Sequence, residues 1–166
     1  MATAPDHLAN LPHMEIRAMT DGDVRAVVEI ERASYQFPWS EGIFRDCLRV
    51  GYACRVVLSE AELIGYGIMS TGAGEAHILN VCVRESFRCR GIGRTLLEHL
   101  LSRAGAGGSS EAYLEVRPSN TAAIRLYQAL GFEPIGVRRG YYQAVGGRED
   151  AAVLRLPLRA RRAHQT

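Results

Sequence analysis

The stretch Arg88–Arg94, which reads Arg-Cys-Arg-Gly-Ile-Gly-Arg, contains residue types that can bind an anion. It follows an apolar segment and opens a segment with helical periodicity. Gly91 and Gly93 let the backbone approach a ligand closely, and the first turn of a helix offers unpaired N–H groups at the positive end of the helix dipole. A pyrophosphate fits this pattern. The alternative is a flexible glycine-containing turn whose arginine side chains are solvated and bind no ligand. A dinucleotide site of the Gly-x-Gly-x-x-Gly type is disfavoured because the third glycine is missing.

Two further side chains, Glu115 and Tyr127, could exchange protons with a substrate. In a strand over Glu111–Arg117, Glu115 lies on the face opposite to the apolar residues and therefore points toward a polar cleft. In the following helix, Asn120, Ala123 and Tyr127 share one face, where the small alanine leaves room for a ligand. A carboxylate can act as a general base and a phenol as a general acid.

The composition excludes several other chemistries. The chain has 166 residues, with 20 basic residues that are all arginine against 18 acidic residues, and a formal net charge of +2. Without lysine it cannot be a Schiff-base enzyme, a Walker-A nucleotide-binding protein or a protein kinase. Any cationic contact to a ligand must therefore come from arginine or from backbone N–H groups.

The cysteines and the hydropathy pattern indicate a cytoplasmic protein. Cys47, Cys54, Cys82 and Cys89 form no Cys-x-x-Cys pair, which disfavours a zinc ribbon and fits a reducing compartment better than a disulfide framework. No His, Cys and Asp cluster suggests a metal. The longest apolar runs have about five residues, far fewer than the ~20 that cross a membrane. The first 16 residues lack the features of a signal peptide. We expect no metal and no membrane contact.

The elements that position these residues follow from periodicity and capping signals. We expect a leader at 1–13, a single domain at 14–157 and a basic tail at 158–166. The predicted strands lie at 15–19, 52–58, 63–71, 76–83, 111–117, 132–138 and 151–156, and the predicted helices at 20–34, 40–50, 91–104 and 120–130. The almost wholly apolar strand 76–83 is expected to be buried on both faces, and Gly131 is expected to end the last helix. This order predicts an α/β fold with a mixed sheet.

Several motifs in this order resemble the GNAT family of acetyl-CoA-dependent N-acetyltransferases. They are Arg88-x-x-Gly91-x-Gly93, the strand Leu114-Glu115-Val116, and Asn120-x-x-Ala123-x-x-x-Tyr127 with Gly131-Phe132 after it. The resemblance covers about residues 14–157. It implies the GNAT fold, whose mixed and mostly antiparallel sheet splays between two adjacent strands and carries flanking helices.

Other stretches are similar to the RimI group within this family, the bacterial enzymes that acetylate the N-terminal alanine of a small-subunit ribosomal protein. These stretches are Phe37-Pro38-Trp39-Ser40, Leu114–Asn120, Arg139–Tyr142 and Gly147–Ala151. One departure is Arg88, because this group often has glutamine there.

The resemblance implies roles for individual residues. Backbone groups of Val81, Cys82 and Val83 would bind the pantetheine of acetyl-CoA, and Asn120 would also contact this cofactor. The pyrophosphate would be cradled by Cys89, Arg90, Gly91, Ile92, Gly93 and Arg94. Glu115 would be the general base and Tyr127 the general acid for a direct attack of an amine on the thioester, without an acyl-enzyme on Cys82 or Cys89.

Aromatic residues are candidates for the walls of an acceptor site, because tyrosine offers an apolar face and a hydroxyl to a peptide. They are Phe37, Pro38, Trp39, Tyr141 and Tyr142. The alternatives are that Phe37 and Trp39 fold onto the core and that Tyr141 and Tyr142 follow ordinary strand alternation. Glu31, Glu149 and Asp150 could bind basic residues of a substrate, although a solvated surface position is expected for each alone. His77 and His99 are expected to be structural.

These features together predict an enzyme, a monomer, that transfers acetyl from acetyl-CoA to the N-terminal alanine of a ribosomal protein. An α-amine has a pKa of about 7.7–8.0 against about 10.4 for lysine, so its neutral fraction is roughly 300-fold higher. The alternatives are acetylation of another protein N-terminus, a lysine side chain or a small amine, or an acetyl-CoA sensor without catalysis. Nucleic-acid binding is suggested only by the arginine tail and would be steeply salt-dependent.

Overall fold

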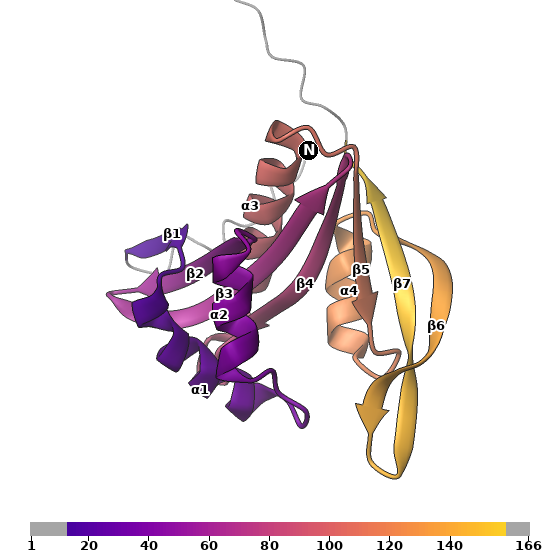
Figure 1. Cartoon of the computed structure of the whole chain (residues 1–166), viewed down its shortest axis with the longest axis horizontal. Helices are drawn as coiled ribbons and strands as arrows, with labels where there is room; N and C mark the ends of the chain where they lie inside the picture. The colour runs from indigo at the N-terminus through magenta and orange to yellow at the C-terminus, as the bar shows by residue number, and fades with distance from the viewer. Residues whose placement is uncertain (1–12, 159–166) are drawn as a thin grey trace, which may run out of the picture. The chain divides into compact units, whose positions relative to one another are not determined.

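The computed structural model of the chain describes residues 13–158, so nearly all of the predicted leader and tail lies outside the described residues. The elements alternate in the predicted order (Figure 1). The strands are β1 (Met14–Ala18), β2 (Ala53–Ser59), β3 (Glu62–Gly72), β4 (Glu75–Val83), β5 (Glu111–Val116), β6 (Glu133–Ala144) and β7 (Gly147–Pro157). The helices are α1 (Val24–Ser34), α2 (Glu41–Arg49), α3 (Ile92–Ala106) and α4 (Thr121–Ala129), with short 3₁₀ turns at Asp21–Asp23 and Glu85–Phe87.

The strands form a mixed sheet in the order β1-β2-β3-β4-β5-β7-β6. The pairs β1–β2, β5–β7 and β6–β7 are antiparallel, whereas β4 and β5 are parallel. The parallel register joins Glu75–Ile78 to Glu111–Leu114, the first four residues of each strand. The predicted α/β fold with a mixed, mostly antiparallel sheet is therefore confirmed.

The chain divides into two compact units. Unit 1 contains the chain up to Ile68 together with Asn80–Glu98, and unit 2 contains Met69–Leu79 together with the chain from His99 onward. Strands β3 and β4 and helix α3 each contribute residues to both units.

In unit 1, polar side chains define where the first two helices begin. Arg17 holds both oxygens of Asp23 at 2.7 and 2.9 Å, and the backbone N–H of Thr20 donates to the same carboxylate at 2.8 Å. These bonds, chiefly those from Arg17, lower the pKa of Asp23 to about 2. Ser40 accepts from the backbone N–H of Ile43 at 3.3 Å and caps α2 at the first residue of the predicted range 40–50.

The core of unit 1 joins the sheet to the first turns of α3. Val57, Ile64, Ile92 and Leu96 form a buried cluster, against which Val81, Val83 and Phe87 pack. The leucines of one helical stripe of α3 are also buried, namely Leu96, Leu97, Leu100 and Leu101. The start of α3 is thus anchored directly beside the end of β4, where the anion-binding stretch lies.

In unit 2, the alternation predicted for β5 is present. Ala112, Leu114 and Val116 are buried, whereas Tyr113 and Glu115 are partly exposed on the other face. The β6–β7 hairpin, which Figure 1 draws as the last two strands, extends well beyond the predicted ranges.

A Schellman motif ends α4 at the predicted glycine. Gly131 has a φ of +102°, and its N–H donates to the backbone carbonyl of Gln128 at 3.0 Å. The N–H of Phe132 donates to the backbone carbonyl of Tyr127 at 3.0 Å. The rings of Tyr127 and Phe132 pack edge to face with centroids 5.9 Å apart. This helix end therefore fixes both the backbone and the ring of Tyr127.

One expectation about the sheet is wrong. Strand β4 is not buried on both faces, because Ala76, Ile78 and Cys82 are buried while His77 and Asn80 are only partly so. The polar residues break the apolar run at positions where side chains from other elements contact them.

Replacing Gly131 with alanine should destabilise the protein. A Cβ there would lie 3.2 Å from Leu156 Cδ1 at φ +102°, and the left-handed conformation costs an L-residue about 1–2 kcal/mol. Gly105→Ala in α3 is the matched control, because a Cβ at this position would meet no atom within 4 Å. This substitution should stabilise the helix by about 0.5 kcal/mol. Urea denaturation measures the free energy of unfolding of both variants. Equal effects of the two substitutions would contradict the assigned role of Gly131.

Candidate active site

The loop before α3 has the backbone geometry of an anion site. Cys89 and Gly91 adopt left-handed conformations, with φ of +62° and +79°, and alternating conformations of this kind turn successive N–H groups toward one point. The N–H of Thr95 bonds to the carbonyl of Gly91 at 3.1 Å, so the helix begins there. The N–H groups of Ile92, Gly93 and Arg94 lie in the first turn, where a helix provides no partner of its own.

The arginine side chains around this loop are bonded to the protein itself. Arg88 donates to the carbonyl of Val83 at 3.0 Å and to Ser34 Oγ at 3.1 Å. Arg90 donates to the carbonyl of Ser86 at 3.3 Å, and Arg94 pairs with Glu98 at 3.0 Å. The arginines thus supply charge near the loop, whereas the groups arranged to contact an anion are the backbone N–H groups.

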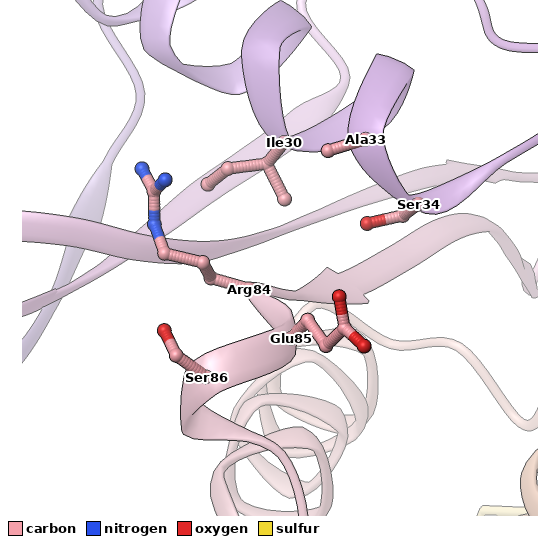
Figure 2. Close-up of a pocket in the computed structure, with 6 residues that line it drawn as sticks. All are labelled: Ile30, Ala33, Ser34, Arg84, Glu85 and Ser86. Atoms are coloured by element: carbon pink, nitrogen blue, oxygen red, sulfur yellow. The ribbon is translucent and has the colours of Figure 1, made fainter.

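A cleft of about 450 Å³ lies between the end of α1 and the segment that leads into this loop. Figure 2 shows Ile30, Ala33 and Ser34 on the helix facing the segment Arg84–Ser86. Sequence reasoning did not identify this cleft, because its two sides are about fifty residues apart in the chain.

The backbone of β4 at the predicted pantetheine-binding residues is closely approached from β3. The N–H of Arg84 donates to the carbonyl of Ile64 at 2.7 Å. A Cβ on Gly65 would lie only 2.9 Å from the carbonyl oxygen of Cys82, so only glycine fits there. The thiol of Cys82 is buried, and its Sγ lies 4.0 Å from the carbonyl oxygen of Val83.

Glu31 is not a solvated surface residue, and that expectation is wrong. It is 2% exposed. Its Oε1 accepts from the N–H of Trp39 at 3.1 Å, and its Oε2 accepts from Asn80 Nδ2 at 3.0 Å and from the hydroxyl of Tyr66. The signal was present in the sequence, because Glu31 follows Val24, Val27 and Val28 on one helical stripe.

The aromatic loop between α1 and α2 is divided between core and surface. The ring of Trp39 packs on Phe44 at a centroid distance of 5.3 Å, and Phe44 meets Tyr66 at 5.5 Å. Phe37 is 39% exposed, and Pro38 is exposed as well. The alternative that the loop folds onto the core therefore holds for Trp39 and not for Phe37.

In unit 2, Glu115 lies between two basic side chains. His77 on the parallel neighbour β4 donates from Nε2 to Oε2 of Glu115, and Arg138 Nε lies 3.4 Å from Oε1. The Glu115 side chain is only 7% exposed. Burial would raise its pKa, but the hydrogen bond and charge of His77 and the charge of Arg138 outweigh burial and lower the pKa. His77 is thus a site residue that sequence reasoning treated as structural.

Tyr127 and Tyr142 belong to the same surroundings as Glu115. Burial raises the pKa of Tyr127 to about 12. Burial also raises the pKa of Tyr142, with the charges of Glu115 and Tyr127 adding to the shift and that of Arg117 opposing it. The guanidinium of Arg117 lies 4.4 Å from the centre of the Tyr142 ring. Tyr142, an acceptor-site candidate, thus lies within electrostatic range of both catalytic candidates, Glu115 and Tyr127.

A bulge in β6 orients the tyrosine pair. Between Arg138 and Tyr142, β6 advances four residues while β7 advances two, from Ala151 to Glu149. Gly140 at φ +59° makes this possible. The ordinary strand alternation considered for Tyr141 and Tyr142 is present beyond the bulge, because Tyr141 is exposed and Tyr142 is partly buried, and the two rings pack edge to face at 4.9 Å.

Three other candidates are engaged in local bonds. Asp150 accepts from the N–H of Gly140 at 2.8 Å. Glu149 accepts from Ser119 Oγ at 3.0 Å and from Arg117 at 3.2 Å, and these bonds lower its pKa. Asn120 caps α4, with its Oδ1 accepting from the N–H of Ala123 at 3.2 Å. Glu149 and Asp150 thus stabilise the bulge and its surroundings.

The candidate residues are divided between the units. The pantetheine and pyrophosphate candidates and the aromatic loop belong to unit 1, whereas Asn120, Glu115, Tyr127 and the tyrosine pair belong to unit 2. Among residues 13–158, no group of three or more His, Cys, Asp or Glu side chains could hold a metal ion. No helix in this part of the chain has the length and hydropathy needed to cross a membrane.

Comparison with known proteins gives a consistent result. A sequence model of the acetyltransferase (GNAT) family matches residues 24–132. The [Ribosomal protein bS18]-alanine N-acetyltransferase of Escherichia coli (strain K12) is 36% identical over 143 residues, which are 86% of this chain and 97% of that protein. The counterpart from Haemophilus ducreyi is 33% identical over 144 residues, 86% of this chain and 99% of that one.

Comparison with solved structures agrees with the sequence comparisons. The crystal structure of the ribosomal-protein-S18-alanine N-acetyltransferase from Escherichia coli has a TM-score of 0.84 at 33% identity and covers 93% of this chain and 99% of that chain. A phosphinothricin acetyltransferase from Sinorhizobium meliloti, solved in complex with AcCoA, has a TM-score of 0.75 at 26% identity and covers 87% of this chain and 88% of that chain.

Removing His77 should raise the pKa of Glu115. The lowered pKa means that Glu115 stabilises the fold above its unfolded pKa and that this stabilisation is lost as pH falls through the folded pKa. In His77→Ala, burial is opposed only by the charge of Arg138 and a backbone hydrogen bond, so the carboxyl should titrate at higher pH. A ¹³C NMR titration of the glutamate carboxyl groups measures this. The control is His77→Gln, which keeps a donor and should shift the pKa less. An unchanged or lower Glu115 pKa in His77→Ala would contradict the contact.

Proposed function

Because this chain belongs to the acetyltransferase (GNAT) family, we propose that it transfers acetyl from acetyl-CoA to the N-terminal alanine of a small-subunit ribosomal protein. The observation that carries the mechanism is Glu115, whose side chain is 7% exposed and is kept ionised by His77 and Arg138, within electrostatic range of Tyr142. The similarity to enzymes named for ribosomal protein bS18 supports this choice of acceptor.

Each step of the reaction has a residue suited to it. The α-ammonium group of the acceptor must lose a proton before its nitrogen attacks the thioester carbon, and Glu115 accepts that proton, directly or through water. The carbon–sulfur bond then breaks, and Tyr127 donates a proton to the departing thiolate. A phenol with a pKa of about 12 stays protonated at neutral pH until a base appears beside it. Each positioned acid or base contributes about 10²–10⁴-fold to the rate.

Cofactor binding is assigned to unit 1 and proton transfer to unit 2. Backbone groups of Val81, Cys82 and Val83 hold the pantetheine, and the N–H groups of the loop Cys89–Arg94 hold the pyrophosphate. Asn120 contributes a further contact from its capping position. The donor set fits this cofactor, because a helix N-terminus with two left-handed residues before it favours phosphate oxygens.

Contacts to the acceptor peptide are proposed separately for each unit, at the aromatic loop in unit 1 and at the tyrosine pair in unit 2. Phe37 and Tyr141, exposed by 39% and 43%, offer apolar faces to a peptide. We further propose that the enzyme acts as a cytoplasmic monomer without direct nucleic-acid contact. A small amine or a lysine side chain remains the alternative acceptor, and the higher neutral fraction of an α-amine at pH 7 favours the N-terminus.

Substitution of the two proton-transfer residues should lower turnover without preventing cofactor binding. Glu115→Gln and Tyr127→Phe should each reduce kcat by about 10²–10⁴-fold, while the calorimetric Kd for acetyl-CoA changes little. Glu111→Gln is a matched control, because Glu111 lies on the same strand and the same face but pairs with Arg155. If Glu115→Gln and Tyr127→Phe keep the wild-type kcat, the mechanism is wrong.

An acceptor panel tests the substrate class. A peptide that begins with the alanine of a small-subunit ribosomal protein should be acetylated once, at its α-amine, as intact-mass analysis and fragmentation will show. The same peptide with a blocked α-amine and a free lysine should react far more slowly, as should a polyamine. Faster turnover of either of these compounds would replace the proposed acceptor with the alternative.

A further inference from the structure

Glu31 connects the aromatic loop to the strand assigned to the cofactor, and this connection lies entirely within unit 1. We propose that Glu31 is a positioning residue that couples cofactor binding along Asn80–Val83 to the conformation of the loop 35–40. The inference rests on the proposed function for what the strand and loop bind. It goes beyond that function by assigning a link between the two.

The three donors to Glu31 come from three different elements. The backbone N–H of Trp39 lies in the loop, the hydroxyl of Tyr66 lies on β3, and Nδ2 of Asn80 lies on β4. Glu31 is 2% exposed and Tyr66 is fully buried. All three donors are neutral, so the carboxyl group serves to join these elements and does not form an ion pair with them.

Burial makes the connection stiff. The carboxyl group of Glu31 is buried, and a buried polar group that loses a hydrogen-bond partner is destabilised, so Trp39 and Asn80 cannot move far from Glu31 without a penalty. A displacement of β4 at Asn80 must therefore move Glu31 or break a bond, and a displacement of Glu31 acts directly on the N–H of Trp39. Asn80 immediately precedes Val81, the first pantetheine candidate, so a ligand on the strand acts next to this contact.

Two exposed sets of hydrogen bonds also join the end of α1 to the cofactor-binding stretch. Tyr35 donates from its hydroxyl to the carbonyl of Val81 at 3.2 Å. Arg88 bridges Ser34 Oγ at 3.1 Å and the carbonyl of Val83 at 3.0 Å. Ser34 is one of the three α1 residues that Figure 2 draws facing the segment before the phosphate loop. The end of α1 is thus tied at three positions to the cofactor-binding stretch, with Glu31 as the buried tie.

Trp39 provides a direct readout, because it is the only tryptophan in the chain. Its ring packs on Phe44 at 5.3 Å, so a shift of the loop changes the surroundings of the indole. Fluorescence excited at the red edge of the tryptophan band therefore reports the loop without any label.

The experiment titrates the full chain with CoA alone and follows Trp39 emission, while calorimetry gives the CoA Kd independently. The wild type should show an emission change that saturates with the calorimetric Kd. Glu31→Gln should bind CoA but lose the change, because one amide cannot accept from all three donors. Asn80→Ala should lose it as well. It provides the test if Glu31→Gln does not fold.

Two variants separate coupling from general loosening. Glu29→Gln makes the same change at an exposed position of α1 and should respond as the wild type does. Tyr66→Phe removes a buried hydrogen bond but leaves the line from Asn80 through Glu31 to Trp39, so it should keep the response. In a second arm, CoA should tighten the binding of the alanine peptide to the wild type by about fivefold or more, and by no measurable factor in Asn80→Ala.

Three results would overturn the proposal. They are a wild-type titration with calorimetric binding but no emission change, a full response in Glu31→Gln or Asn80→Ala, and a loss of response in Tyr66→Phe equal to that in Asn80→Ala. If the alanine peptide is not acetylated but the emission response and its loss in Asn80→Ala persist, the coupling stands and only the acceptor assignment fails.

Discussion

A carboxyl group withdrawn from water must be given hydrogen-bond donors, and two glutamates impose this requirement on the two units. Glu115 is supplied by His77 and Arg138, which carry or can carry charge and keep its pKa low. Glu31 is supplied by a hydroxyl, an amide and a backbone N–H. Because the donors differ, charged or chargeable for Glu115 and neutral for Glu31, the two carboxyl groups have different roles. The first carboxylate is held ionised beside the residues that would exchange protons, whereas the second is fully used in holding elements together.

Features that depend on near neighbours in the chain were predictable. The Ser40 cap, the glycine that ends α4 and the alternating burial of β5 each involve residues a few positions apart, so local rules suffice. The glycine-containing loop at the start of α3 was also predictable, because its glycines and the helix that follows it are contiguous; its binding of phosphate stays a prediction. These local signals, taken in order, were enough to identify the family.

Features that depend on distant neighbours were not predictable from the sequence. The partnership of His77 with Glu115 requires the parallel register that sets His77 beside Tyr113. The burial of Glu31 requires donors 35 and 49 residues further along the chain. The bulge in β6 depends on how its hydrogen bonds are shared with β7, for which the chain offers only Gly140 as a local sign. In each case the pattern of residue types was visible but the partner was not.

The anchored arginines of the phosphate loop bear on how fast a ligand arrives. Arg88 and Arg90 donate to neutral acceptors of the protein and keep their charges beside the loop, whereas the charge of Arg94 is offset by Glu98. The field of such charges draws a polyanion toward the loop from beyond contact range and is screened over about 8 Å at physiological ionic strength. The lifetime of the complex is set instead by the short-range backbone contacts. If the loop binds the cofactor as proposed, capture and retention would be governed by different atoms, and salt would slow the first much more than it shortens the second.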